Sequence, residues 1–241
     1  MDIGKSFSFP FQDERWLSKS LIGAIVAAVP IVNFAWLGYL VDLVRNVMAG
    51  STTPLPEWGD FGNKWVRGLL LTFASMIYAI PAIILACIPL TMLGGFSATQ
   101  QGEWSDQLGG LFAGVGGIFA CLIAVYSLFL TFILPAIYIN YARNSTFAAL
   151  FEFSRIMKII SEELSKYATA WVVSLLAGIV VGLVVGLVTG LVGWIPCVGW
   201  VLAILIGAVG SVYTFYIYGH LFGQVGAAQG KPLSPSTDIT L

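Results

Sequence analysis

Five long apolar stretches dominate the sequence and constrain its fold more than any other feature. A helix needs about 20 apolar residues to cross the hydrocarbon core of a bilayer, so each stretch is long enough to span. Charged residues make up only 10% of the chain, whereas a soluble domain carries about 25%. The sequence therefore predicts an all-α integral membrane protein, in which 1–241 form a single multi-pass domain in the lipid bilayer. The stretches cover residues 21–44, 67–96, 109–139, 168–193 and 198–225.

Basic residues are distributed unequally between these stretches. Lysines and arginines occur in the N-terminal arm, in 45–67, in 140–167 and in the C-terminal tail, whereas 97–108 and 194–197 contain none. Cytoplasmic loops of membrane proteins carry an excess of Lys and Arg. All the basic segments lie on one side only if 21–44 enters the membrane and returns to the same side. We therefore expect four full spans with both termini cytoplasmic, followed by a flexible tail over 229–241.

The first stretch contains a place to bend. Pro30 removes a helical hydrogen bond near its middle, and the polar Asn33 could satisfy backbone groups that the bend frees. The favoured interpretation is a re-entrant hairpin of two half-helices, and the alternative is one Pro-kinked spanning helix. Broken helices often line binding sites in transporters. Pro30, Asn33, Asp42 and Arg45 therefore form a possible ligand or bend site, in which Asp42 and Arg45 are expected to make a local ion pair; an ion site is the alternative.

A tryptophan-rich segment follows the hairpin. Pro56 suits the first turn of a helix. Trp58, Phe61 and Trp65 then fall at i, i+3 and i+7, which places them on one helical face. This pattern predicts an amphipathic helix in the cytoplasmic membrane surface with its aromatic side chains buried in lipid. The alternative is a connecting helix that packs on the bundle.

A second amphipathic segment lies between the third and fourth long spans. Asn144 or Ser145 is a good N-cap for it, and Phe147 and Phe151 belong to its apolar side. Lys158, Glu162 and Lys166 follow at intervals of four residues on a charged side, where they are expected to form i,i+4 pairs. We expect this segment to lie in the same membrane surface, with packing on the bundle as the alternative.

Small residues recur at every fourth position in the last two stretches. In lipid, helices associate mainly through close backbone contact, which small residues permit. The stripes therefore indicate helix packing, either between the protein's own spans or with another copy or another membrane protein. The residues are Ser174, Gly178, Gly182, Gly186 and Gly190 in one stretch and Gly199, Ala203, Gly207 and Ser211 in the other.

Few residues offer catalytic chemistry. The net charge of −1 leaves no basic face for nucleic acid, and no HExxH, GxSxG, P-loop or paired-acid pattern occurs. His220 lies among tyrosines near the end of the last stretch, where an interfacial aromatic belt is the simplest interpretation and a proton relay or ligand the alternative. We predict no catalytic residue, no cofactor and no metal, and hence no enzyme.

The sequence resembles a known family over most of its length, and the specific motifs lie in the first 70 residues. Trp16, the Pro30–Asn33 break, Gly38-Tyr39, Arg45-Asn46 and the Leu55-Pro56-Glu57-Trp58 run with Asp60-Phe61 and Gly68 are similar to the bacterial and archaeal membrane proteins called "domain of unknown function 4013". The resemblance implies a multi-pass protein of the prokaryotic plasma (inner) membrane. It supplies an architecture and no functional residues.

These features favour a non-enzymatic role. The small-residue stripes, together with the absence of charge within the spans, predict a membrane scaffold or accessory subunit that associates with itself or with a larger complex. The alternative, based on the break at Pro30–Asn33, is a transporter or channel for a lipid or a small neutral solute.

Overall fold

Helices form almost the whole of the computed structural model, which describes residues 1–98 and 105–229, with side chains for 1–89 and 114–229. No strand occurs within these ranges, so the predicted all-α fold is confirmed. Apart from Gln229, the tail predicted to be flexible lies outside the described residues. The helices are α1 (Ile3–Ser8), η1 (Phe9–Gln12, a 3₁₀ helix), α2 (Trp16–Ala28), α3 (Phe34–Met48), α4 (Phe61–Ala98), α5 (Ser105–Asn144), η2 (Phe147–Phe151, also 3₁₀), α6 (Phe153–Glu162), α7 (Leu164–Val192) and α8 (Val198–Ala227).

Four of these helices are long and apolar enough to cross a membrane, as the sequence predicts. Their surfaces support this assignment: Leu187 and Leu191 of α7 are 71% and 73% exposed. Large contiguous apolar surfaces are unfavourable in water and are suited to acyl chains. The chain is therefore a membrane protein with transmembrane helices. The candidate spans are Phe61–Pro89, Gly114–Asn144, Leu164–Val192 and Val198–Ala227.

The first apolar stretch is broken into two separate helices. α2 has 13 residues and α3 has 15, so neither reaches across a hydrocarbon core about 30 Å thick. The chain reverses between them at 29–33, where Ile31 has a positive φ of 71°. The alternative of one kinked spanning helix is therefore wrong.

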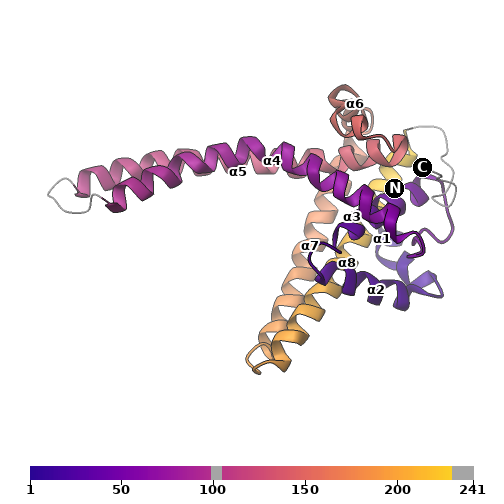
Figure 1. Cartoon of the computed structure of the whole chain (residues 1–241). Helices are drawn as coiled ribbons and strands as arrows, with labels where there is room; N and C mark the ends of the chain where they lie inside the picture. The colour runs from indigo at the N-terminus through magenta and orange to yellow at the C-terminus, as the bar shows by residue number, and fades with distance from the viewer. Residues whose placement is uncertain (99–104, 230–241) are drawn as a thin grey trace. The chain divides into compact units, whose positions relative to one another are not determined.

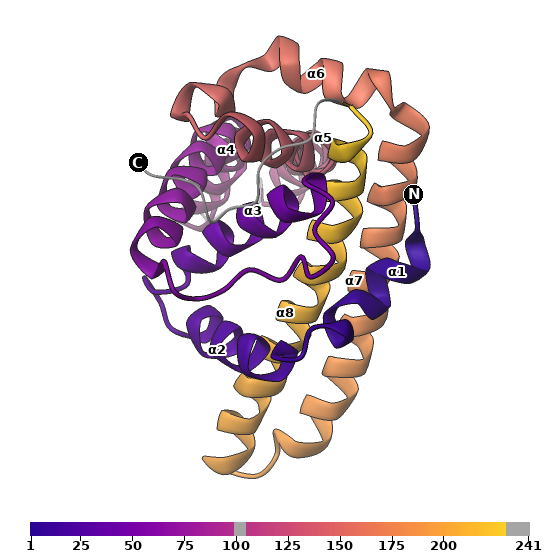
Figure 2. The same cartoon turned by 90° about the vertical axis from the view of Figure 1, so that its right-hand side faces the viewer.

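The structure divides into two compact units, Met1–Thr72 with Pro135–Leu241 and Phe73–Leu134. In the first unit, α8 lies between α7 on one side and the α2–α3 pair on the other (Figure 2). The short helix α1 also packs on α8. The last long helix is thus the element around which the rest of this unit is arranged.

Glycines explain how α8 accommodates its neighbours. A Cβ atom at Gly219 or Gly223 would press into the α3 side chains Leu43 and Val47, which lie directly against the α8 backbone. On the other side of α8, a Cβ at Gly210 would press into Val185 of α7. Small residues therefore bring α8 close to both neighbours, as expected for helices that pack in lipid.

The second unit contains α4 from Phe73 and α5 as far as Leu134, two helical segments that run side by side (Figure 1). The Tyr126 hydroxyl donates a hydrogen bond to the backbone carbonyl of Tyr78 at 2.7 Å. Many apolar side chains of this second unit are exposed; Val125, for example, is 68% exposed. This surface is also suited to lipid.

Candidate functional site

The bend between α2 and α3 is held by a tryptophan. Trp65 Nε1, on α4, donates a hydrogen bond of 2.8 Å to the Ile31 carbonyl oxygen. Asn33 makes no capping hydrogen bond to the start of α3. The expectation that Asn33 satisfies the freed backbone is therefore wrong. An aromatic donor from another helix reaches the bend instead, because the positive φ of Ile31 directs its carbonyl out of the helical pattern.

A cavity of about 550 Å³ lies beside this bend. Asn33, Trp36, Thr72 and Ser211 line it together with apolar side chains of α2, α3 and α8. The Trp36 indole Nε1 is buried and has no hydrogen-bond acceptor among the described residues. The bend predicted as a ligand site thus does border a cavity with a few polar groups, although Asp42 and Arg45 do not line it.

A buried ionic cluster joins α3 to α4. Asp42 is 1% exposed; its Oδ2 atom lies 3.0 Å from Lys64 Nζ, and its Oδ1 atom accepts a hydrogen bond from Arg67. Lys64 and Arg67 are themselves 4% and 5% exposed. The predicted Asp42–Arg45 pair is wrong, because two cations of α4 occupy the carboxylate while Arg45 donates to Ser145 Oγ at 3.3 Å. Cations one helical turn apart on α4 therefore anchor α3.

A second ionic cluster fixes the start of α2. Lys19 Nζ is buried and contacts Asp13 Oδ2 at 2.7 Å, Glu57 Oε1 at 2.8 Å and the Leu55 carbonyl oxygen at 3.0 Å. Burial by itself raises the pKa of Asp13, but hydrogen bonds from Lys19 and from the Arg15 backbone, with both positive charges, hold that pKa below its usual range. The non-helical segment before α4 is thereby attached to α2.

Of the three aromatic residues of the tryptophan-rich segment predicted to lie in the membrane surface, Trp58 and Trp65 are partly buried against the protein core, whereas Phe61 is 38% exposed. Trp58 precedes α4 at a bend in a non-helical segment. It stacks on Tyr39 with ring centroids 4.5 Å apart and donates from Nε1 to the Lys19 carbonyl at 2.9 Å. No helix begins at Pro56, so Trp58, Phe61 and Trp65 do not share a helical face. The prediction of a tryptophan-rich amphipathic helix is therefore wrong, because ring stacking and indole hydrogen bonds within the protein outweigh the helical pattern.

The second amphipathic segment is divided into two short helices. α5 continues to Asn144 and Ser145 has a positive φ of 52°, so neither residue caps the following helix. In η2, Phe147 and Phe151 are 45% and 36% exposed and pack edge to face. α6 follows and buries an isoleucine face against the bundle. The segment therefore packs on the bundle while keeping its phenylalanines accessible.

Only one of the two predicted i,i+4 ion pairs forms. Lys158 Nζ lies 3.6 Å from Glu162 Oε1, as expected. Lys166 instead pairs with Glu163 at 2.9 Å, because the chain turns at Glu163 between α6 and α7. The predicted Glu162–Lys166 pair is therefore wrong.

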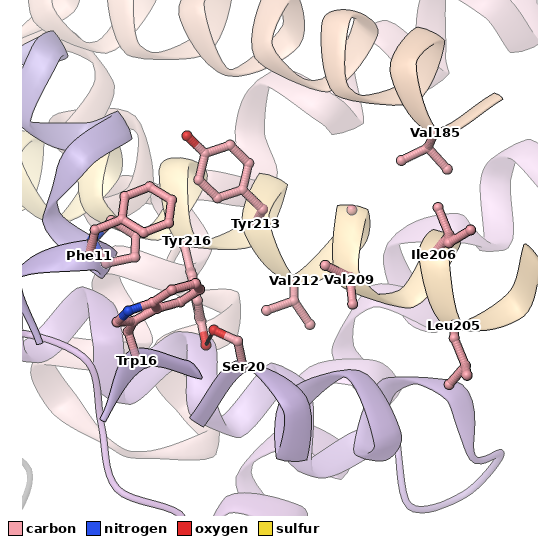
Figure 3. A pocket seen from close by; sticks show the side chains of 12 residues that line it. Phe11, Trp16, Ser20, Val185, Leu205, Ile206, Val209, Val212, Tyr213 and Tyr216 are labelled. Carbon is pink, nitrogen blue, oxygen red and sulfur yellow. Dashed lines mark hydrogen bonds between the residues drawn. The ribbon is translucent and has the colours of Figure 1, made fainter. Parts of the chain in front are cut away.

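An apolar cavity of about 500 Å³ lies between the N-terminal helices and the α7–α8 pair (Figure 3). Aliphatic side chains such as Val185, Leu205 and Val209 line one part, and the rings of Phe11 and Trp16 line another. Its hydroxyl groups have partners: Ser20 donates to Tyr216 at 3.4 Å, and Tyr213 donates to the Phe7 carbonyl. The cavity is thus suited to apolar matter such as an acyl chain.

The two predicted small-residue stripes differ in how they are covered. In α7, a Cβ at Gly178 would contact only Thr214, and at Gly182, Gly186 and Gly190 nothing lies within 4 Å. In α8, a Cβ at Gly199 would overlap the Val192 carbonyl oxygen, whereas nothing lies within 4 Å of a Cβ at Gly207. Within the described part of the chain, packing therefore leaves Gly182, Gly186 and Gly190 of the α7 stripe uncovered. The remaining stripe members are accessible to varying degrees: Ser174 and Ala203 are half-buried and Ser211 is exposed.

His220 contributes to the contact between α1 and α8. It is 4% exposed, its ring stacks on Phe9, and its Nδ1 atom lies 2.8 Å from Ser6 Oγ and 3.0 Å from Gln224 Nε2. His220 is therefore a structural residue of the α1–α8 contact rather than part of an exposed aromatic belt.

Sequence reasoning missed Lys64, Arg67 and Lys19. A signal for the first two was present: Asp42 lies in an apolar stretch, and a buried carboxylate requires cationic partners. Lys64 and Arg67 are three residues apart and so share a helical face. Among the residues with described side chains, no three His, Cys, Asp or Glu groups lie together as a metal site would require.

The fold and these sites define a helical membrane protein with a broken N-terminal helix pair anchored by buried ion clusters. The chain matches the model of the family described as "Protein of unknown function (DUF4013)" over residues 21–190, and it belongs to that family. This match confirms the family resemblance, and it covers most of the chain, as expected. No curated protein and no solved structure matches the chain.

Proposed function

We propose that the protein is a non-enzymatic membrane scaffold or accessory subunit that associates through the small-residue face of α7. The observation that carries this proposal is the contrast between the two helices. Gly210, Gly219 and Gly223 of α8 are covered by α7 and α3, whereas Gly182 and Gly186 of α7 have nothing within 4 Å. A glycine groove on a lipid-facing helix favours close approach of another helix.

A topology accompanies this proposal. The four long spans cross a prokaryotic plasma membrane, and the α2–α3 pair enters and leaves on the cytoplasmic side, where both termini lie. This arrangement is supported by the distribution of Lys and Arg, which are absent from 97–108 and 194–197. It is further supported by the lengths of α2 and α3, which are too short to span.

Replacing Gly186 with leucine is expected to weaken association. The leucine fills the groove, so we expect the oligomer or complex to dissociate about tenfold more readily, which corresponds to about 1.4 kcal/mol. Native mass spectrometry of protein extracted in a lipid-preserving polymer measures the populations.

Val184→Leu is the matched control for this variant. Val184 lies on the same helix, is 56% exposed and points about 200° away from Gly186. We expect it to leave association unchanged. A wild-type protein that is only a monomer without a second protein contradicts the scaffold proposal.

A transporter or channel for a lipid or small neutral solute is the second candidate. It is favoured by the cavity beside the helix break, which Asn33, Thr72 and Ser211 line with polar groups. No Asp, Glu, Lys or Arg lines this cavity among the described residues, which is consistent with an uncharged substrate group.

Asn33→Ala is expected to reduce any such flux severalfold without unfolding the protein, because Asn33 makes no capping hydrogen bond to α3. The assay follows transbilayer movement of a fluorescent phospholipid and efflux of glycerol in proteoliposomes. Asn63→Ala, a polar residue outside the cavity that bonds Asp60, is the control. Wild-type proteoliposomes that are no faster than empty liposomes rule out this second candidate.

A further inference from the structure

A polar pocket of about 440 Å³ is formed where α5, α6 and the end of α8 meet. Its position follows from the candidate spans: α5 ends at Asn144 and α8 at Ala227, so the pocket lies at the level where two spans end together. The headgroups of a bilayer are found at this level. The lining is largely polar, unlike that of the apolar cavity between the N-terminal helices and the α7–α8 pair. It comprises Asn140, Arg143, Arg155, Lys158, Glu162 and Gln229, with Asn144 and Ile159.

Three cations from two helices converge on this pocket. Arg143 is held from within the fold, since it donates hydrogen bonds to the Gly226 and Gln229 carbonyl oxygens at the end of α8. Arg155 and Lys158 come from α6, and their side chains are 62% and 70% exposed. Each guanidinium has five N–H donors in a planar fork that matches the oxygens of a phosphate.

The acidic neighbours do not neutralise these cations. Glu152 bonds Arg155 at 3.0 Å and Glu162 lies 3.6 Å from Lys158. The three cations and the two carboxylates together have a net charge of +1. Exposed ion pairs of this kind contribute only about 0–1 kcal/mol each, so they yield readily to a multiply charged anion.

Two further observations indicate the kind of anion. Gln229 Oε1 is buried in the pocket wall and has no hydrogen-bond donor among the described residues, so it is suited to a hydroxyl group. Phe153 and Met157 lie on α6, the helix that also carries Arg155 and Lys158, and are 53% and 41% exposed. An amphipathic helix with this pattern places apolar side chains among acyl chains and its charges among headgroups.

We infer that the pocket between α5, α6 and α8 binds a phosphate ester whose alcohol part carries a hydroxyl group, such as the phosphoglycerol headgroup of an anionic phospholipid. Arg155 and Lys158 contact the phosphate oxygens, Arg143 supplies the fixed charge beneath them, and Gln229 Oε1 accepts the hydroxyl. This inference is independent of the scaffold proposal, which concerns a different helix face. Basic pockets at the ends of spans are a recurring form of lipid recognition.

The test uses the full chain in nanodiscs of mixed phosphatidylglycerol and phosphatidylcholine. Native mass spectrometry counts the lipids that remain bound. The wild type is expected to retain phosphatidylglycerol preferentially. An Arg155→Gln/Lys158→Gln variant is expected to lose that preference by roughly tenfold or more, since each basic residue near an anionic surface contributes about 1 kcal/mol. Lys166→Gln, which removes a cation paired with Glu163 outside the pocket, is the control and is expected to change nothing.

A second measurement keeps the inference testable should the double variant not fold. Raising the salt concentration from 0.1 to 1 M shortens the Debye length from about 10 to 3 Å, so the wild type is expected to lose its preference as well. Glycerol 3-phosphate is the soluble probe. Glycerol 3-phosphate could raise the thermal unfolding midpoint of the wild type but not of the double variant, while neither lipid is preferred. In that case the pocket binds phosphate, and its ligand is a soluble phosphate compound rather than a lipid headgroup. Equal retention of both lipids with no shift from glycerol 3-phosphate overturns the inference.

Discussion

Asp42→Asn is expected to lower the free energy of unfolding by about 3–5 kcal/mol, because it leaves two buried cations without their counterion. Lys64 and Arg67 are 4% and 5% exposed and both contact this carboxylate. Neither can turn to water without opening the contact between α3 and α4. The measurement is the unfolding midpoint in lipid nanodiscs, or the free energy from a denaturant titration in mixed micelles.

Two companion variants separate charge from packing at Asp42. Asp60→Asn removes a carboxylate whose side chain is 54% exposed and 3.8 Å from Arg67, and is expected to cost less than about 1 kcal/mol. Lys64→Met added to Asp42→Asn removes one of the uncompensated cations and is expected to recover part of the loss. An Asp42→Asn protein as stable as the wild type refutes the assignment of this cluster as the α3–α4 anchor.

Gly68→Ala is expected to be the most damaging single-methyl change in the first unit, costing at least about 3 kcal/mol because a packed backbone relaxes only in part. A Cβ at Gly68 would overlap the Phe34 carbonyl oxygen, and one at Gly38 would overlap the Lys64 carbonyl oxygen. The overlapping atoms belong to the backbone and cannot rotate away. The shift in unfolding midpoint reports the effect.

Gly62→Ala is the matched control on the same helix. Nothing lies within 4 Å of a Cβ at Gly62, and alanine has a higher helix propensity than glycine. We expect the midpoint of Gly62→Ala to be unchanged or raised slightly. Equal midpoints for Gly68→Ala and Gly62→Ala contradict the close α3–α4 backbone contact.

The long helices and the break after α2 could be predicted because they depend on local properties. Four apolar runs, each long enough to cross the bilayer as a helix, are typical of transmembrane helices. Pro30 shows where the first stretch ends its regular structure. The family resemblance rested on the same region and is confirmed by the match over residues 21–190. These features require no knowledge of which helices touch.

The partners of Asp42, Trp58 and Trp65 could not be predicted, because they depend on tertiary contacts. Spacing favoured Arg45 for Asp42, but α4 brings two cations to the same carboxylate. Spacing also favoured a helix through Trp58, whereas that residue lies in a non-helical segment, where it contacts Tyr39 and the Lys19 carbonyl. In both cases a contact between distant segments outweighs the local pattern.

The fastening of α1, α2 and α3 to α8 has a consequence for how the protein is made. The N-terminal helices find their packing surface on the last helix, and Asp2 and Gln224 exchange hydrogen bonds across almost the whole chain. A ribosome adds about 5–20 residues per second, so the interval between Met48 and Val198 is on the order of ten seconds. During that time the α2–α3 pair has an apolar face without its partner helix. Assembly in the cell must therefore shelter this nascent pair, in lipid or on a helper, until synthesis reaches α8.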